Sequence, residues 1–206
     1  DGIRDVAVTG VQTCALPISF EEFRQHVLPQ LIERRATKKT LRIWSAASST
    51  GQEAYSLAMI LQEEHAKLAG WRIEIVGTDI SHAVVARAQT GRYSQFEVQR
   101  GLPIQMLVKY FRKVEDQWEV SPQLKSMVQF REANLLRDWT GLGQFDIVFC
   151  RNVLIYFDLE HKTSILERIA KSMAPDGFLF LGGAETVLGI SNRFEDRKST
   201  RLNSSH

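Results

Sequence analysis

Residues 41–53 read LRIWSAASSTGQE and residues 72–79 read RIEIVGTD, and the order of features in these two stretches decides the fold. Each stretch begins with a short apolar run that is typical of a buried strand. The first run ends in a loop of small residues at 48–51, and the loop is followed by helical periodicity. A strand, a helix and a second buried strand together predict a βαβ unit with parallel strands.

The rest of the chain continues this alternation of strands and helices. Apolar runs predict further strands at 127–132, 145–150 and 178–181, and helical spacing predicts helices at 20–35, 52–68, 81–90 and 159–173. We therefore expect an α/β fold with a doubly wound, largely parallel sheet covered on both faces. A hairpin pattern within residues 109–130 predicts a small inserted antiparallel β subdomain.

The two ends of the chain differ in character from the middle. Residues 8–18 read VTGVQTCALPI and residues 196–206 read DRKSTRLNSSH, and both look like translated sequencing-library adapter. Our hypothesis is that residues 1–19 and 196–206 are non-native tails and that residues 20–195 are the natural domain, itself a fragment. The alternative is a pair of native tails.

Composition excludes several classes of protein. The chain has 206 residues, a net charge of +2 and no clustered basic patch, which argues against nucleic acid as a partner. No apolar run reaches the roughly 18–20 residues of a membrane span, and no signal peptide is visible. The two cysteines and five histidines lack the spacing of a metal site. We expect a soluble, cytoplasmic, monomeric protein without a metal.

The residues that follow each strand are the candidate site, because ligands of open α/β sheets bind at the carboxyl ends of the strands. Gly51 lies in the first such loop, where it permits close backbone approach to a ligand, although a tight turn alone would also require it. Asp79 ends the second strand and can accept hydrogen bonds from ribose hydroxyls, although it could instead cap the next helix. The pair favours a nucleoside cofactor.

The later strands are also followed by polar residues. Asn134 can pair with an adenine edge while Leu135 packs on its face, although Asn is also common in turns. Arg151 and Asn152 follow the buried run FDIVFC, and a charge at the end of a buried strand needs a partner or a ligand. Tyr156 can place its hydroxyl over the same cleft, although a lone tyrosine is more often a packing residue.

Taken together, several segments resemble the chemotaxis-receptor glutamate O-methyltransferases, the CheR family. The segments are WSAASSTGQEAYS, IVGTDIS, GRYS, RGLP, FCRNVLIYFD and FLFLGGAE, in the family's order and spacing. The resemblance implies an S-adenosylmethionine-dependent methyltransferase domain with a Rossmann-like fold. It implies that the cofactor pocket is lined by Gly51, Glu53, Asp79, Asn134, Leu135, Arg151 and Asn152, and that Tyr156 and Arg151 are the catalytic residues near the methyl group.

The resemblance also implies a reaction and partners. A receptor glutamate would be converted to its methyl ester with S-adenosylhomocysteine as the second product. The partners would be the cytoplasmic domains of methyl-accepting chemotaxis receptors, and in some members a receptor C-terminal peptide that docks on the β subdomain. Because the family's N-terminal domain is absent, we expect this fragment to turn over poorly.

Two other functions remain open from the sequence. The chain could be a non-catalytic module that binds S-adenosylmethionine inside a larger signalling protein. It could also be a nucleotide oxidoreductase on a similar fold, but the loop at 48–51 lacks the G-x-G-x-x-G pattern of a dinucleotide site.

Overall fold

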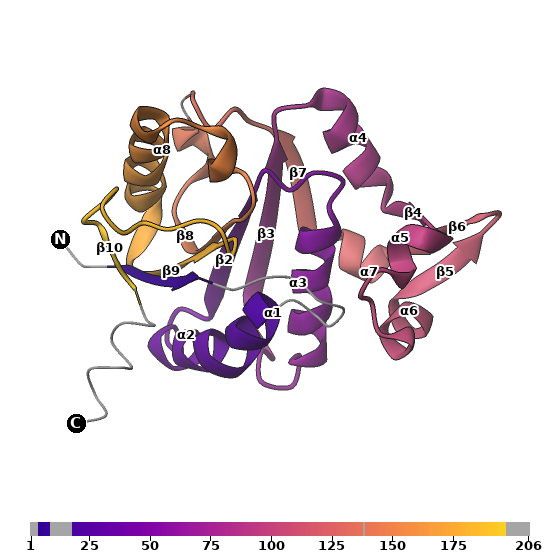
Figure 1. Cartoon of the computed structure of the whole chain (residues 1–206). Coiled ribbons are helices and arrows are strands. Elements are labelled where there is room, and N and C mark those ends of the chain that lie inside the picture. The colour runs from indigo at the N-terminus through magenta and orange to yellow at the C-terminus, as the bar shows by residue number, and fades with distance from the viewer. Residues whose placement is uncertain (1–3, 9–17, 138, 197–206) are drawn as a thin grey trace.

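The computed structural model describes residues 4–8, 18–137 and 139–196, which form a central sheet with helices on both faces and a small second sheet at one end (Figure 1). The central sheet has seven strands in the order β10-β1-β9-β8-β2-β3-β7, and every strand pair is parallel. Its strands are β1 (Arg4–Val8), β2 (Thr40–Ala46), β3 (Arg72–Asp79), β7 (Val128–Glu132), β8 (Phe145–Cys150), β9 (Met173–Leu181) and β10 (Phe194–Asp196). The predicted fold class is confirmed.

The helices between the strands cover both faces of the sheet. They are α1 (Ile18–Glu22), the π-helix η1 (Phe23–Val27), α2 (Leu28–Arg34), α3 (Gln52–Glu63), α4 (His82–Thr90) and α8 (Leu159–Lys171), with the short 3-10 helices η2 (Thr140–Leu142) and η3 (Leu154–Tyr156). The sequence predicted one helix over residues 20–35. The structure divides it at η1, just before Pro29, which has no N–H to donate in the first turn of α2.

Alternate side chains of the central strands enter two separate cores. Ile43, Ile75 and Phe149 lie in the core beneath α1, α2 and α3, whereas Trp44 and Val148 lie in the core beneath α8. All five side chains are fully buried. This two-sided burial explains why the strands are nearly continuous apolar runs, and it fixes their register, since a shift by one residue would exchange the two faces.

Local signals set the ends of the helix that follows β3. The Ser81 hydroxyl accepts from the Val84 N–H at 3.4 Å and caps the start of α4. Gly91, at φ 60°, ends the same helix in the left-handed conformation. Both ends match the sequence prediction.

The small sheet is antiparallel, in the order β4-β6-β5, and it lies beside the central sheet at the β7 end (Figure 1). Its strands and the short helices around it are β4 (Arg92–Ser94), α5 (Gln95–Gln99), α6 (Ile104–Tyr110), β5 (Phe111–Val114), β6 (Gln117–Val120) and α7 (Pro122–Lys125). The hairpin at β5 and β6 was expected within 109–130. The sheet also recruits β4 from an earlier segment, and the last strand of that range, β7, pairs with β3 in the central sheet instead.

Two further differences concern strands β9 and β1 of the central sheet. Strand β9 begins at Met173, so Pro175, Asp176 and Gly177 lie inside it rather than before it, with an irregular register against β8. Residues 4–8, which the sequence argument left out of the fold, form β1 between β9 and β10. No helix in the described part of the chain is long and apolar enough to cross a membrane.

Candidate functional site

The carboxyl ends of the parallel strands lie along one side of the sheet, which we call the carboxyl edge. Hydrogen bonds connect the loops that follow these strands. The loop after β2 contacts the residue that ends β3, because the Ser49 N–H donates to Asp79 Oδ2 at 3.0 Å. The segment after β7 joins them through the Ala133 N–H, which donates to the Asp79 carbonyl at 2.9 Å. The structure therefore brings the candidate residues of three strands to one place.

Asp79 is the centre of this group. Its Oδ1 accepts from the Ser81 N–H at 3.1 Å while Oδ2 accepts from Ser49. Each carboxylate oxygen can accept a second hydrogen bond. Asp79 thus fixes two loops and still has acceptor capacity for hydroxyl groups of a ligand, while Ser81 and not Asp79 caps α4.

A buried ion pair joins α3 to the end of β8. Arg151 Nη1 lies 3.1 Å from Glu53 Oε2, and the Ser45 hydroxyl donates to Glu53 Oε1 at 2.7 Å. The side chains of Arg151 and Glu53 are only 11% and 17% exposed. Burial raises the pKa of the Glu53 carboxyl, and Arg151 and Ser45 offset part of that rise. The pair is a largely buried, charged group at the carboxyl ends of the strands, where ligands of this fold bind.

Two buried polar atoms beside these groups have no partner. Among the described residues, Ser48 Oγ and Arg151 Nε are buried side-chain atoms without a hydrogen bond. Leaving such groups unpaired costs stability, so they are candidates for contact with a ligand or water. A buried carboxylate, a guanidinium with a free N–H and a free aspartate lone pair suit a ligand that carries an ammonium, a carboxylate and a ribose, and S-adenosylmethionine carries all three.

The backbone conformation at position 51 and the neighbouring side chains both require a glycine there. Gly51 adopts φ 92°, and a Cβ at this position would lie 2.7 Å from the ring of Phe130 on β7. A Cβ on Gly77 would meet the same ring at 2.6 Å. The tight-turn interpretation therefore accounts for Gly51, and a ligand is not needed to explain it.

The residues after β7 are arranged as a turn. Asn134 Oδ1 accepts from the Leu136 N–H at 2.9 Å, which is the turn role left open by the sequence. Leu135 is only 7% exposed and packs in the core beneath α8, and its carbonyl accepts from Arg168 at 3.2 Å. The Leu135 side chain is therefore a core residue, and the Asn134 amide nitrogen donates no hydrogen bond to another residue in the described ranges.

The loop after β8 carries the last two predicted residues. Asn152 has a left-handed backbone, at φ 57°. Tyr156 ends η3 and is 80% exposed, and no hydrogen bond links its hydroxyl to any residue in the described ranges. The structure thus brings Arg151 and Glu53 into contact but leaves the Tyr156 side chain at the surface.

Sequence reasoning missed one acidic residue at this edge. Glu185 follows β9 and is 6% exposed, and its carboxylate accepts hydrogen bonds from four backbone N–H groups. Three of these donors are in the loop after β8. The signal available in the sequence was an acidic residue in the segment GGAE, directly after a buried strand.

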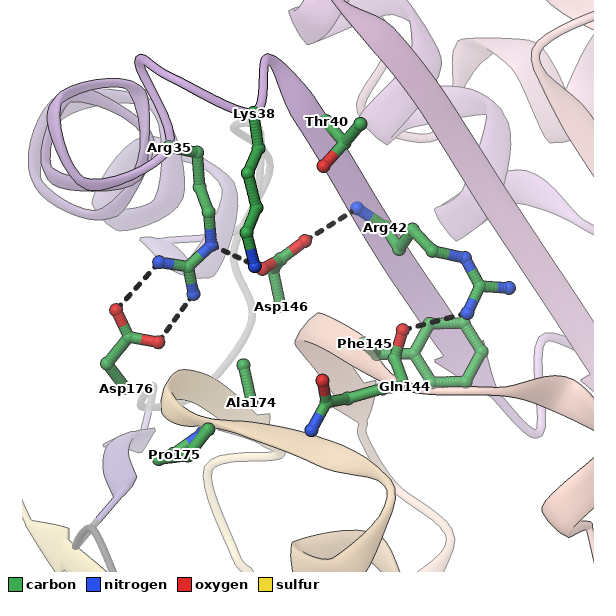
Figure 2. A pocket seen from close by; sticks show the side chains of 10 residues that line it. All are labelled: Arg35, Lys38, Thr40, Arg42, Gln144, Phe145, Asp146, Ala174, Pro175 and Asp176. Carbon is green, nitrogen blue, oxygen red and sulfur yellow. Dashed lines mark hydrogen bonds and ion pairs between the residues drawn. The ribbon is translucent and has the colours of Figure 1, made fainter.

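A cavity of about 290 Å³ lies at the opposite, amino-terminal edge of the sheet (Figure 2). Arg35, at the end of α2, lies between Asp146 and Asp176 in this view and pairs with both. Asp146 also accepts from the Arg42 N–H at 2.9 Å. The lining includes none of the predicted site residues, and both of its carboxylates pair with Arg35. We interpret this cluster as the structural connection between α2 and the sheet.

Comparison with known proteins adds to this geometry. Residues 17–202 match the family model described as "CheR methyltransferase, SAM binding domain". This range extends a few residues into both segments that the adapter hypothesis sets aside.

Three curated proteins are similar over most of the chain. "Chemotaxis protein methyltransferase 1" of Pseudomonas aeruginosa is 43% identical over 180 residues, which is 85% of this chain and 65% of that protein. "Chemotaxis protein methyltransferase Cher2" of Pseudomonas putida is 41% identical with the same coverage. "Chemotaxis protein methyltransferase 1" of Vibrio cholerae is 40% identical over 80% of this chain and 61% of that protein. The chain thus spans less than two thirds of the length of these relatives.

Proposed function

Because this chain belongs to the CheR methyltransferase family, we propose that it binds S-adenosylmethionine and is the catalytic domain of a protein-glutamate O-methyltransferase. The substrates would be glutamate side chains of methyl-accepting chemotaxis receptors, and the enzyme would act in the cytoplasm as a monomer. The observation that carries the proposal is the buried Glu53–Arg151 pair, with its unpartnered Arg151 Nε, beside the loops that Asp79 holds.

Different residues at the carboxyl edge would bind different parts of the cofactor. Asp79 accepts from the ribose hydroxyls through the lone pairs that Ser49 and Ser81 leave free. Asn134 donates to the adenine edge through its amide nitrogen. Leu135, which is largely buried beside Asn134, would pack against the adenine with the part of its side chain that remains exposed. Gly51 and Asn152 shape the loops on either side.

The charged pair serves the methionine end. Glu53 would face the ammonium group and Arg151 the carboxylate, so that each charge of the pair gains a second partner of opposite sign. Bound S-adenosylmethionine would supply a methyl group on a sulfonium sulfur, and a receptor carboxylate would take that methyl as the carbon–sulfur bond breaks, which leaves a methyl ester and S-adenosylhomocysteine.

This reaction requires little proton transfer by the protein. A glutamate with a pKa of about 4.3 is already ionised at neutral pH, so no general base is required. The contribution of the protein is position and electrostatics. Arg151 would order the methyl end of the site, and Tyr156, whose side chain is exposed, would meet the incoming substrate.

The small sheet is the proposed docking site for a receptor C-terminal peptide. Two apolar side chains of α6, Ile104 and Val108, are 64% and 71% exposed beside this sheet. An apolar surface of this kind favours a partner. A receptor tail peptide should bind the chain, and Val108→Glu should weaken that binding at least about tenfold. Leu159→Glu, which alters an equally exposed apolar residue on α8, should leave it unchanged.

We also propose residues 20–195 as the functional domain. A chain limited to 20–195 should bind S-adenosylhomocysteine as tightly as the 206-residue chain. Weaker binding by the shorter chain would show that the flanking segments, including β1, contribute to the domain.

Two experiments test the function. Isothermal titration of the 206-residue chain with S-adenosylhomocysteine should give saturable binding, whereas NAD should give none. The full-length protein should transfer a radiolabelled methyl group to receptor-containing membranes and form a product that alkali releases as methanol. Binding without transfer by the full-length protein would support a non-catalytic module instead, and binding of NAD alone would support an oxidoreductase.

A further inference from the structure

Glu185 makes an unusual set of contacts for a buried carboxylate. Its Oε2 accepts from the N–H groups of Asn152 and Gly182 at 2.8 and 2.7 Å. Its Oε1 accepts from the N–H groups of Val153 and Leu154 at 2.9 and 2.7 Å. Hydrogen bonds to an ionised acceptor are stronger than neutral ones. One side chain from the loop after β9 therefore holds three consecutive N–H groups of the loop after β8.

The loop that Glu185 holds contains an uncommon backbone conformation. Asn152 has φ 57°, in the left-handed region, which asparagine adopts more readily than most residues with a side chain. A Cβ on Gly182 would lie 2.7 Å from Glu185 Oε2 and 2.9 Å from the Asn152 backbone nitrogen, so a larger residue here would disturb these contacts. Because Asn152 directly follows Arg151, the backbone that Glu185 fixes also fixes the direction in which the Arg151 side chain leaves the strand.

We propose that Glu185 is a positioning residue of the methyl-transfer site: its carboxylate sets the backbone of residues 152–154, and it thereby directs Arg151 toward Glu53 and places η3, with Tyr156, beside the site. This inference rests on the proposed function and goes beyond it, since Glu185 itself need not touch the cofactor or the substrate.

The electrostatic surroundings agree with this placement. The pKa of the Cys150 thiol is raised chiefly by burial, and the carboxylate of Glu185 raises it further. The same carboxylate adds to the rise in the pKa of Glu53, after the larger effect of burial. Glu185 is therefore close enough to the Glu53–Arg151 pair to influence its charge balance.

The test compares two Glu→Gln variants in the 206-residue chain. In Glu185→Gln one oxygen can still accept, but the new amide group points N–H donors at N–H donors. In the control, Glu74→Gln, the lost carboxylate pairs with Arg42 near the opposite end of β3. Both variants lose an ion-paired or hydrogen-bonded carboxylate, whereas only the first should alter the loop after β8.

Three measurements decide the outcome. We expect Glu185→Gln to weaken S-adenosylhomocysteine binding at least about tenfold and to speed amide hydrogen exchange at residues 152–154. Glu74→Gln should change neither, even where its melting temperature falls as much. In the full-length enzyme, Glu185→Gln should lower kcat and leave the KM for receptor within about twofold.

Glu185→Asp provides the conservative variant. It keeps the charge on a shorter side chain and should recover a large part of both the binding and the exchange protection, which also covers the case in which Glu185→Gln does not fold. Unchanged binding or unchanged exchange in a folded Glu185→Gln chain would overturn the role of Glu185 alone. If the wild-type chain bound no S-adenosylhomocysteine, the proposed function would fail together with this inference.

Discussion

Arg151 and Glu53 are 98 positions apart in the sequence, yet Nη1 of the first lies 3.1 Å from Oε2 of the second in the buried centre of the carboxyl edge. This contact connects the loop after β8 with the first turn of α3, and Glu185 extends the connection to the loop after β9. The loops after β9, β8, β2, β3 and β7 are thus tied to their neighbours in the order in which the strands lie in the sheet.

Removal of Arg151 should be strongly destabilising. Arg151→Met leaves the Glu53 carboxylate buried without its cation, and we expect a loss of about 3 kcal/mol in the free energy of unfolding at pH 8. In the double variant Arg151→Met/Glu53→Gln the uncompensated charge is gone, so most of that loss should be recovered. Urea unfolding of the four chains of this cycle measures the coupling.

The same cycle has a defined pH dependence. Burial raises the pKa of Glu53 in the folded chain above its unfolded value of about 4.3. Protonation of Glu53 therefore stabilises the folded chain. This contribution to the free energy of unfolding is present in full below a pH of about 4.3 and is lost as the pH rises through the pKa of Glu53 in the folded chain. The loss caused by Arg151→Met should accordingly be smaller at pH 5 than at pH 8. An equal loss at both values would show that Glu53 does not titrate in this interval.

Substitutions at three glycines can distinguish the cost of backbone strain from the cost of steric overlap. Gly70 has φ 77° with open space around it, Gly77 has ordinary φ but faces Phe130, and Gly51 combines both conditions. Substitution by alanine should cost about 1 kcal/mol at Gly70, roughly 1–3 kcal/mol at Gly77 and the most at Gly51.

Thermal and chemical unfolding of the three variants checks this order. Addition of Phe130→Leu should recover part of the loss at Gly51 and Gly77 and none at Gly70. A similar recovery at all three positions would contradict the assigned contacts.

Much of the fold could be predicted because local signals and tertiary contacts agree. The central strands are apolar on both faces, and Ser81 and Gly91 delimit α4 as expected. Only the β5–β6 hairpin of the small sheet could be predicted. Strand β4 could not, because it is three residues long and its partner β6 lies more than twenty positions later. So short a strand has no periodicity of its own, and only pairing defines it.

The site was predictable in its location but not in its connections. Residues that follow parallel strands must share an edge, so Asp79 and Arg151 could be placed there from the sequence. That Asn134 closes a turn, that Leu135 points into the core, and that Glu185 holds the loop after β8 depend on side-chain directions that spacing alone does not determine.

The Arg35–Asp176 pair in the cavity at the opposite edge predicts a variant that loses stability at neutral pH but not in acid. The hydrogen bonds from Arg35 hold the pKa of Asp176 below its ordinary value of about 3.9. The contribution of this contact to the free energy of unfolding is present above that value. It is lost as the pH falls through the pKa of Asp176 in the folded chain. Asp176→Asn should therefore be less stable than the wild type at pH 7, and the difference should disappear in acid.

The size of this effect is small, because the Asp176 side chain is 41% exposed. We expect less than about 1 kcal/mol at pH 7. Asp116→Asn, in the exposed turn between β5 and β6, serves as the control and should show no difference. Neither variant should alter the affinity for S-adenosylhomocysteine, and a loss of affinity in Asp176→Asn would place a ligand at the edge shown in Figure 2.

The ribose contact of Asp79 can be tested with a matched pair of ligands. Asp79→Ala should weaken S-adenosylhomocysteine binding about 10- to 100-fold, because the hydroxyl groups lose a charged acceptor. It also frees the Ser49 and Ser81 N–H groups, so part of any loss could come from the loops. The 2′-deoxy analogue of the ligand separates the two causes. If Asp79 holds the ribose, the analogue should bind the wild type more weakly and lose less affinity in Asp79→Ala than S-adenosylhomocysteine does, because only its 3′-hydroxyl remains to be lost. Equal losses for both ligands would assign Asp79 a role in loop structure only. Calorimetry with both ligands on both chains gives the four affinities that this comparison needs.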